Sequence, residues 1–167
     1  MEKNEFRKIL FDTACATMAC DGSIDDSEIQ ALKKLSKTST YFKNLKLADR
    51  LSKFRNNIDK NPSKTIENTL KVVKEAYFEP LQELILLEVI LLIVYADVKI
   101  HPKEIEYLQT VRSFLNIEDQ TIINRFGEIE ALVSKNDLKS NKKTIDKIEY
   151  NEDDFEDMYF GIDPNKK

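Results

Sequence analysis

The sequence predicts an all-α domain, and three observations lead to that prediction. Apolar residues recur at the three- and four-residue spacing of a helix face along most of the chain, and no convincing strand pattern is present. Glycine (3 residues) and proline (4 residues) are scarce, whereas all-β domains need many turns and usually contain more of both. A segment around Asp21 also repeats 76 residues later, around Asp97.

The helical spacing defines the elements in chain order. Asn61-Pro62-Ser63 separates two of them because proline cannot continue a helix. Pro80 and Pro102 suit the first turn of the helices that follow them. The strongest apolar run, residues 84–96, is too short to span a bilayer and contains Glu88, so it predicts a buried central helix rather than membrane insertion. The predicted helical segments are residues 6–18, 28–35, 41–58, 64–78, 80–96, 102–115 and 118–133.

The internal repeat is the most informative feature. Residues 11–29 and 87–105 align without a gap, and each copy reads as an apolar helix, an Asp where it ends, a turn with one buried Ile, and a new helix with Glu in its first turn. Duplicated helical hairpins often pack together, each burying the apolar face of the other. The chain is therefore expected to contain two pseudo-symmetric helical-hairpin repeats. The matched pairs are Asp12 with Glu88, Asp21 with Asp97, Ile24 with Ile100, and Glu28 with Glu104.

Helix capping explains some of the repeated residues. Asp25 is a suitable N-cap, and Glu28 follows at the spacing of a capping box. In the second copy His101 takes the cap position and Glu104 again lies three residues later. Gly22 is suited to the left-handed conformation that ends a helix. Glu28 and Glu104 thus have a structural explanation that requires no ligand.

Capping does not explain Asp21 and Asp97, because a carboxylate at a helix C-terminus faces the negative end of the helix dipole. Their presence indicates a compensating donor or a cation. The first copy has the back half of a calcium loop, but the earlier ligand positions fall on Thr17 and Ala19, so an EF-hand is excluded. A looser divalent-cation site (calcium or similar) is the remaining hypothesis. Its candidate ligands, gathered from both copies, are Asp21, Asp25, Glu28, Asp97 and Glu104.

Composition narrows the function classes. The net charge of −4 argues against nucleic acid as the main partner, since phosphate binding requires a basic surface. A basic cluster in the helix predicted at residues 41–58 is interpreted as a solvent-exposed face of that helix. No Gly-rich phosphate loop or activated nucleophile is present, and His101 is the only histidine, so we expect no enzymatic activity. The basic cluster consists of Lys43, Lys46, Arg50, Lys53 and Arg55.

Two cysteines indicate the compartment. Cys15 and Cys20 lie five residues apart on one helix, about 140° around its axis, and cannot pair with each other. They are interpreted as small core residues in a reducing environment, which predicts a cytoplasmic protein.

The composition changes after residue 134. Residues 1–134 are predicted to form the helical domain, and residues 135–167 a polar linker followed by an acidic-aromatic segment around Phe155 and Tyr159. This segment either docks on the domain or recognises a partner.

The two motifs, Ala19-Cys20-Asp21-Gly22-x-Ile24-x-x-x-Glu28 and Tyr95-Ala96-Asp97-x-x-Ile100-x-x-x-Glu104, resemble those of the TerB-like family, which includes tellurite-resistance TerB and the N-terminal domain of DjlA-type co-chaperones. The resemblance covers roughly residues 5–133. It implies about seven helices in two pseudo-symmetric halves, with suspected metal ligands at Asp21, Glu28, Asp97 and Glu104. It also implies a role in stress or metal responses beside other Ter-type proteins, with peripheral membrane proximity. Val98 stands where the family has glycine.

Two functional hypotheses follow. The first is a non-catalytic, divalent-cation-binding domain of the tellurite-resistance or stress-response type that acts through protein partners. The alternative is a metal-independent adaptor that binds protein through the acidic-aromatic tail or the basic central helix. Neither indicates an oligomeric state.

Overall fold

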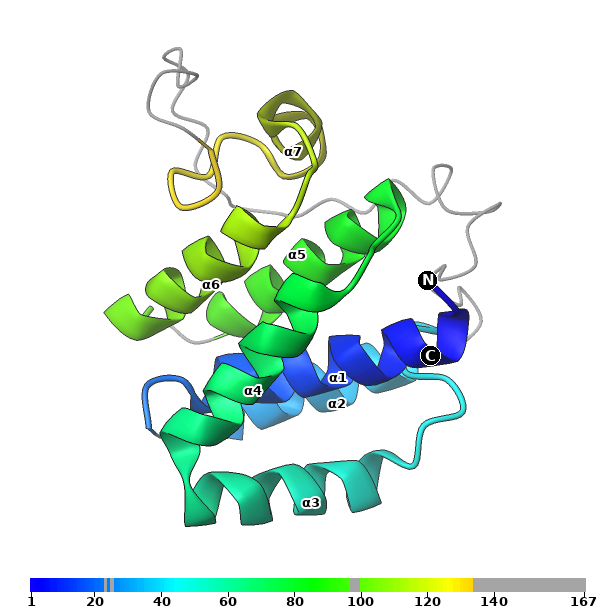
Figure 1. The fold of residues 1–167 in the computed structure, drawn as a ribbon, viewed down its shortest axis with the longest axis vertical. Helices are drawn as coiled ribbons and strands as arrows, with labels where there is room; N and C mark the ends of the chain where they lie inside the picture. The colour runs from blue at the N-terminus through cyan, green and yellow to red at the C-terminus, as the bar shows by residue number, and fades with distance from the viewer. Residues whose placement is uncertain (23, 25, 97–99, 134–167) are drawn as a thin grey trace.

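The computed structural model describes residues 1–22, 24, 26–96 and 100–133, and helices make up most of this part of the chain (Figure 1). The described residues contain no strand, so the predicted all-α class is confirmed. The helices are α1 (Lys3–Ala19), α2 (Asp26–Thr38), α3 (Leu47–Lys60), α4 (Pro62–Glu75), α5 (Pro80–Val94), α6 (Pro102–Phe114) and α7 (Asp119–Phe126).

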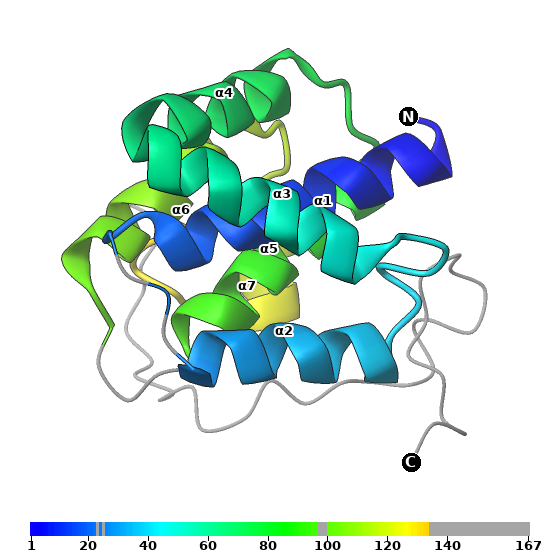
Figure 2. The ribbon, with the colours of Figure 1, turned by 90° about the horizontal axis from the view of Figure 1, so that it is seen from below.

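Helices α1 and α5 form the centre of the fold. They pack against each other, and α1 also contacts α3, α4 and α6, while α5 contacts α2 and α6. Figure 2 shows α2 and α4 on opposite sides of this central pair. Both central helices are apolar around most of their circumference, as expected for helices that are covered on all sides. At 15 residues α5 is about 22 Å long, shorter than a bilayer core of about 30 Å.

Within the described residues, no helix has the length and apolar character needed to cross a membrane.

The helix boundaries follow the sequence repeat. Helix α2 spans Asp26–Thr38 and α6 spans Pro102–Phe114, so both ends are 76 residues apart. The preceding helices, α1 and α5, also end in corresponding turns. The Cys20 amide donates to the Thr17 carbonyl in the first copy, and the Ala96 amide donates to the Ile93 carbonyl in the second. The two helix pairs thus share their local structure where it is described, while a symmetry axis between them stays a prediction.

The third helix begins later than the sequence predicts. A helix was expected from residue 41, but α3 starts at Leu47, and turns occupy the preceding segment. Asn44 has a φ of +70°, in the left-handed region, which interrupts a right-handed helix. Tyr41 and Phe42 are nevertheless buried, and the Phe42 ring meets Phe11 edge to face at 5.4 Å. Their periodic spacing therefore reflects burial in a loop rather than a helix.

The last helix is also shorter than predicted, because a residue with a positive φ again interrupts it. Helix α7 ends at Phe126 because Gly127 adopts a φ of +79°. Ile129, Leu132 and Val133 are buried in the turns that follow, so their apolar pattern again marks the core and not a continuing helix.

Asn61 alone separates α3 from α4. Its amide donates to the Asn57 carbonyl at the end of α3, and its side chain accepts from the Lys64 amide at the start of α4, at 3.1 Å. Pro62 is the first residue of α4, as expected from its fixed φ. The predicted break is confirmed, and the two helices form a hairpin with almost no linker.

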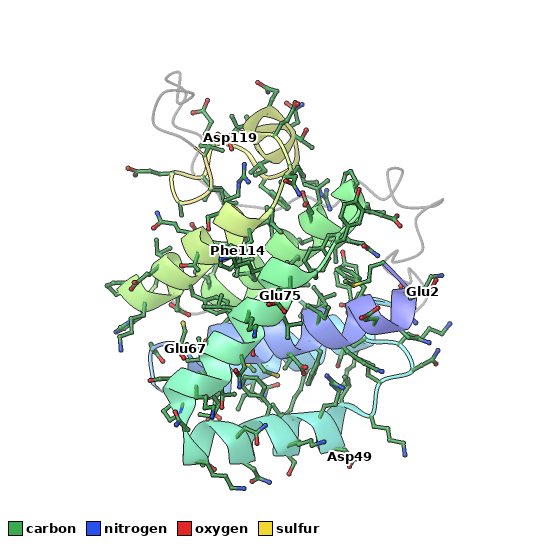
Figure 3. The ribbon with its side chains drawn as sticks, in the orientation of Figure 1. Glu2, Asp49, Glu67, Glu75, Phe114 and Asp119 are labelled. Carbon is green, nitrogen blue, oxygen red and sulfur yellow. The ribbon has the colours of Figure 1, made fainter. Side chains whose placement is uncertain are left out.

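Acidic side chains on the outer surfaces of the helices contribute to the charged shell (Figure 3). Glu2, Asp49, Glu67 and Glu75 are among those exposed.

Candidate functional site

The first elbow, residues 20–25 between α1 and α2, carries the first motif. Gly22 has a φ of +96°, and its amide donates to the Ala19 carbonyl at 3.1 Å, so the predicted left-handed turn is confirmed. Ile24 packs against the core but is half-buried rather than fully buried, and the same holds for Ile100 in the second copy. Asp25, the predicted N-cap, lies outside the described residues.

The second elbow, residues 95–101 between α5 and α6, ends in a capping box. The His101 ring accepts from the Lys103 amide through Nδ1 at 3.3 Å, and Glu104 Oε2 accepts from the His101 amide at 2.7 Å. Pro102 is the first residue of α6. The predicted structural roles of His101, Pro102 and Glu104 are therefore confirmed. Asp97 and Val98 lie outside the described residues.

The negative charges of carboxylates from both copies act on the Cys20 thiol. The pKa of the Cys20 thiol is raised to about 12, mainly by burial and in smaller part by the negative charges of Glu104, Asp21 and Glu28. A carboxylate influences a thiol in this way only when it lies near it. Asp21 and Glu28 belong to the first copy and Glu104 to the second, so charges from both copies act on this one thiol, although no three of these groups in the described residues are arranged to hold one ion.

The candidate ligands have the oxygen atoms that a hard cation prefers, but the described residues do not contain a complete set of them. Glu28 and Glu104 are buried, each about 5% exposed, and they present carboxylate oxygens, which hard divalent ions prefer. One oxygen of Glu104 already caps α6. Within residues 1–22, 24, 26–96 and 100–133, no three His, Cys, Asp or Glu side chains are arranged to hold a metal ion together. Two of the five predicted ligands, Asp25 and Asp97, fall outside this range.

A protein cation also lies beside the first elbow. Arg55 of α3 lines a hollow of about 360 Å³ together with Ala19, Gly22, Ile24 and Asp59. Its charge reaches the interior of α1, where it acts to lower the pKa of the Cys15 thiol against a larger increase from burial. Arg55 therefore supplies positive charge near the C-terminus of α1, where the sequence pattern required a compensating group.

The two cysteines are poor nucleophiles. Burial is the main cause of the raised pKa of both thiols, and both are free of disulfides. The Cys20 thiol donates to the Thr17 carbonyl at 3.0 Å. Cys15 is buried in the core as predicted, whereas Cys20 is only half-buried. The raised pKa of each thiol disfavours the thiolate, which is the reactive form.

The matched acidic residues Asp12 and Glu88 each pair with an arginine, which the sequence analysis did not predict. Asp12 Oδ2 accepts from Arg50 Nη2 of α3 at 2.6 Å, and Glu88 Oε1 accepts from Arg125 Nη2 of α7 at 3.1 Å. Glu88 Oε2 also accepts from the Tyr41 hydroxyl at 2.6 Å. Arg50 is therefore not part of a freely solvated face, as the basic cluster had been interpreted. The two arginines are 75 residues apart, one short of the repeat offset, so a gapless comparison does not align them.

Asp12 lines a hollow of about 560 Å³ between α1, α3 and α4, and neither Asp21 nor Glu88 is among the residues that line it.

The described part of the chain is an all-α domain that contains two helix pairs with matching boundaries. The model of the family described as "Tellurite resistance protein TerB" matches residues 10–125, more than half of the chain. The chain therefore belongs to the TerB family. Comparison with curated proteins and with solved structures gave no significant match.

Proposed function

We propose that this chain is a non-catalytic domain that binds a divalent cation at its two elbows and transmits the binding to protein partners in a metal or stress response. The observation that supports the proposal is that Glu28 and Glu104 are buried in the first turns of α2 and α6, while the charges of Asp21, Glu28 and Glu104 all act on Cys20 at the end of α1. Carboxylate oxygens are the ligands that hard divalent ions prefer, and a bound ion would favour their ionised form. Asp25 and Asp97 are proposed to complete the oxygen set.

The proposal further assigns a mechanical consequence to the ion. Glu28 lies in the first turn of α2 and Glu104 in the first turn of α6. An ion held by both joins the starts of two helices that belong to different copies. Binding is therefore expected to stiffen the packing of the two pairs and to present a different surface to a partner.

Calcium, magnesium and manganese titrations of the full chain, followed by amide NMR shifts, test the site. We expect shifts at Cys20, Asp21, Glu28 and Glu104 at or below millimolar ion, with paramagnetic broadening by manganese centred on Cys20. Because affinity at oxygen sites follows the number of charged ligands, E28Q or E104Q should each weaken binding about ten-fold or more. Glutamine retains the acceptor needed for capping, so these variants keep the helix starts.

The matched control is the E67Q/E75Q variant, which removes two exposed carboxylates from α4, a helix that supplies none of the proposed ligands. It should bind the ion as the unchanged chain does. D25N and D97N test the two ligands outside the described residues. The proposal is wrong if no elbow amide shifts at millimolar ion, or if the α4 control loses as much affinity as E28Q and E104Q. An effect of E28Q without one of E104Q contradicts a site shared by both copies.

The alternative function, a metal-independent adaptor that uses the tail or the basic helix, makes the opposite prediction. Partner capture by such an adaptor is unchanged by a chelator and by E28Q, but falls when residues 135–167 or the basic side chains of α3 are altered.

A further inference from the structure

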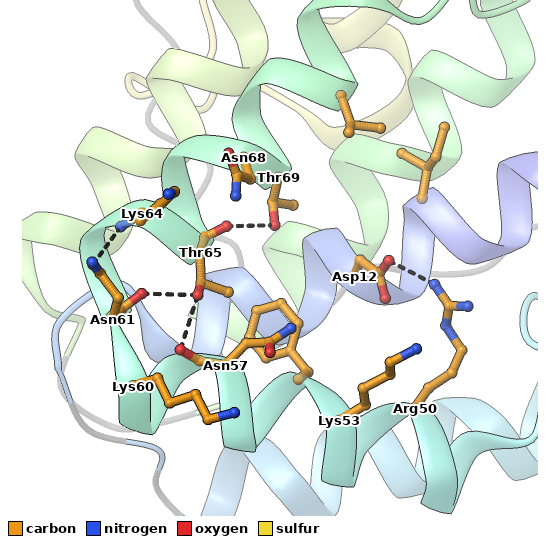
Figure 4. A pocket seen from close by; sticks show the side chains of 13 residues that line it. Asp12, Arg50, Lys53, Asn57, Lys60, Asn61, Lys64, Thr65, Asn68 and Thr69 are labelled. Carbon is orange, nitrogen blue, oxygen red and sulfur yellow. Dashed lines mark hydrogen bonds and ion pairs between the residues drawn. The ribbon is translucent and has the colours of Figure 1, made fainter.

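A hollow between three helices has an unusual charge distribution for an acidic protein. This basic pocket, of about 560 Å³, lies between α1, α3 and α4 (Figure 4). Its volume is within the range of about 300–1,000 Å³ that is usual for small-molecule sites. Four cationic side chains line it and only one carboxylate, that of Asp12. The cationic residues are Arg50, Lys53, Lys60 and Lys64.

The single carboxylate is already engaged. Asp12 accepts a 2.6 Å hydrogen bond from Arg50, which neutralises one of the four cations. Lys53, Lys60 and Lys64 take part in none of the ion pairs found among the described residues. Lys53 and Lys60 come from α3 and Lys64 from the facing helix α4, so three lysines that have no ion-pair partner within the described residues line the pocket (Figure 4).

Two further features favour a negatively charged occupant. The pocket includes the N-terminal end of α4, which is the positive end of that helix dipole, and the first turn of α4 contains no acidic residue. The Nε of Arg50 is buried with no hydrogen-bond partner among the described residues, so the guanidinium has an unused donor.

The rest of the lining suits an organic group rather than a bare ion. Phe54, Ile9 and Val72 supply an apolar surface, with Phe54 largely buried and Val72 48% exposed. The amide side chains of Asn57 and Asn68 add polar groups on the α3 and α4 sides. Pockets that bind small organic ligands combine apolar walls with a few convergent polar groups in this way.

We propose that this pocket binds a small organic phosphate, with Lys53, Lys60 and Lys64 holding the phosphate and Phe54 and Val72 contacting the organic part. The phosphate chemistry is shared by a free metabolite and by the headgroup of a phosphate-monoester lipid. The pocket does not include the elbow carboxylates, so the proposal is independent of the cation site.

The test uses the full chain and amide NMR titration with AMP, ATP and inorganic phosphate. We expect shifts at Asn57, Lys64, Thr65 and Asn68, and tighter binding of the nucleotides than of inorganic phosphate. The K53Q/K60Q/K64Q variant should bind about ten-fold more weakly or worse, since it removes three charge-assisted contacts. All three lysines are exposed, so this variant is expected to fold.

A matched control removes the same charge elsewhere. Lys33, Lys34 and Lys37 are exposed on α2, which lies on the other side of the central helices from α4 (Figure 2). K33Q/K34Q/K37Q should change the affinity less than two-fold. The proposal is overturned if both triple variants weaken binding equally, because that indicates unspecific attraction, or if no phosphate probe shifts the pocket amides at millimolar concentration.

A second arm distinguishes the two sources of phosphate. Co-sedimentation with phosphatidylcholine vesicles that contain phosphatidic acid, lost in the α3–α4 variant and kept in the α2 variant, supports the pocket and assigns it to a lipid headgroup. Nucleotide binding without co-sedimentation supports a free metabolite.

Discussion

The two acid–arginine pairs occupy corresponding places in the two halves but have different surroundings. Asp12 of α1 pairs with Arg50, and the two side chains are 38% and 29% exposed at the edge of the basic pocket. Glu88 of α5 pairs with Arg125, and its side chain is 1% exposed. The first pair faces solvent and the basic pocket, whereas the second is enclosed by the core and extended by Tyr41.

This difference indicates that the same pair of charges serves two purposes. Buried ion pairs contribute little net stability, but their removal on one side leaves an uncompensated charge in the interior. Exposed pairs contribute about 0–1 kcal/mol because water screens them. The Glu88 pair therefore fixes the Tyr41 turn and α7 onto α5, while the Asp12 pair leaves the pocket accessible.

The largest effect should come from breaking the enclosed pair. E88A leaves Arg125 and the Tyr41 hydroxyl without their shared acceptor and creates a cavity, so the free energy of unfolding should fall by about 3–5 kcal/mol. D12A, at the corresponding position, should lower it by at most about 1 kcal/mol. Urea unfolding of both variants at pH 7 measures the comparison. Equal losses would show that the two environments do not differ as described.

The pH dependence of stability should separate the pairs further. Burial raises the pKa of Glu88 above its ordinary value of 4.5, against smaller opposing effects of Tyr41 and Arg125. A raised carboxyl pKa stabilises the fold below the unfolded-state pKa, and this contribution is lost as the pH rises through the folded-state pKa. E88Q cannot ionise and does not show this loss.

The unfolding free energy of E88Q relative to the unchanged chain should therefore increase from pH 4 towards neutral pH. Burial also raises the pKa of Asp12, opposed by Arg50, so D12N should show the same sign. Its change should be smaller because solvent screens this carboxyl. A relative stability of E88Q that falls with rising pH contradicts the assignment. Urea titrations at four pH values are sufficient.

The smallest effect concerns the first elbow. Gly22 adopts a φ of +96° with open space around its Cα, so G22A should lower the unfolding free energy by about 1 kcal/mol through backbone strain alone. G22N should lower it less, because asparagine tolerates this conformation better. Thermal unfolding measures both. If G22N is the more damaging variant, side-chain contacts rather than backbone strain govern the turn.

The sequence predicted features that local chemistry determines. The capping box at His101 and Glu104, the left-handed Gly22 and the break at Pro62 each follow from a few neighbouring residues, and the structure confirms them. The predicted start of α3 was wrong because Tyr41 and Phe42 are buried in a turn at positions that also fit helical spacing. The positive φ of Asn44, which shows the turn, is a property of the structure.

The tertiary partners were not predictable in the same way. Nothing in the neighbourhood of Asp12 or Glu88 indicates an arginine from another helix, since these contacts join residues 38 and 37 positions apart. The repeat does contain a signal, because Arg50 and Arg125 lie almost one repeat apart, but it appears only when a one-residue shift is allowed. The basic pocket was missed because its cations come from two helices whose facing sides depend on packing.

Helix α3 borders both candidate sites. Arg55, Ile58 and Asp59 face the hollow beside the first elbow, while Lys53, Asn57 and Lys60 face the basic pocket. Since Asn61 joins α3 directly to α4, a tilt of α3 at one site alters the geometry at the other. If either ligand induces such a tilt, the two affinities are linked, and thermodynamic reciprocity requires each ligand to change the binding of the other by the same factor.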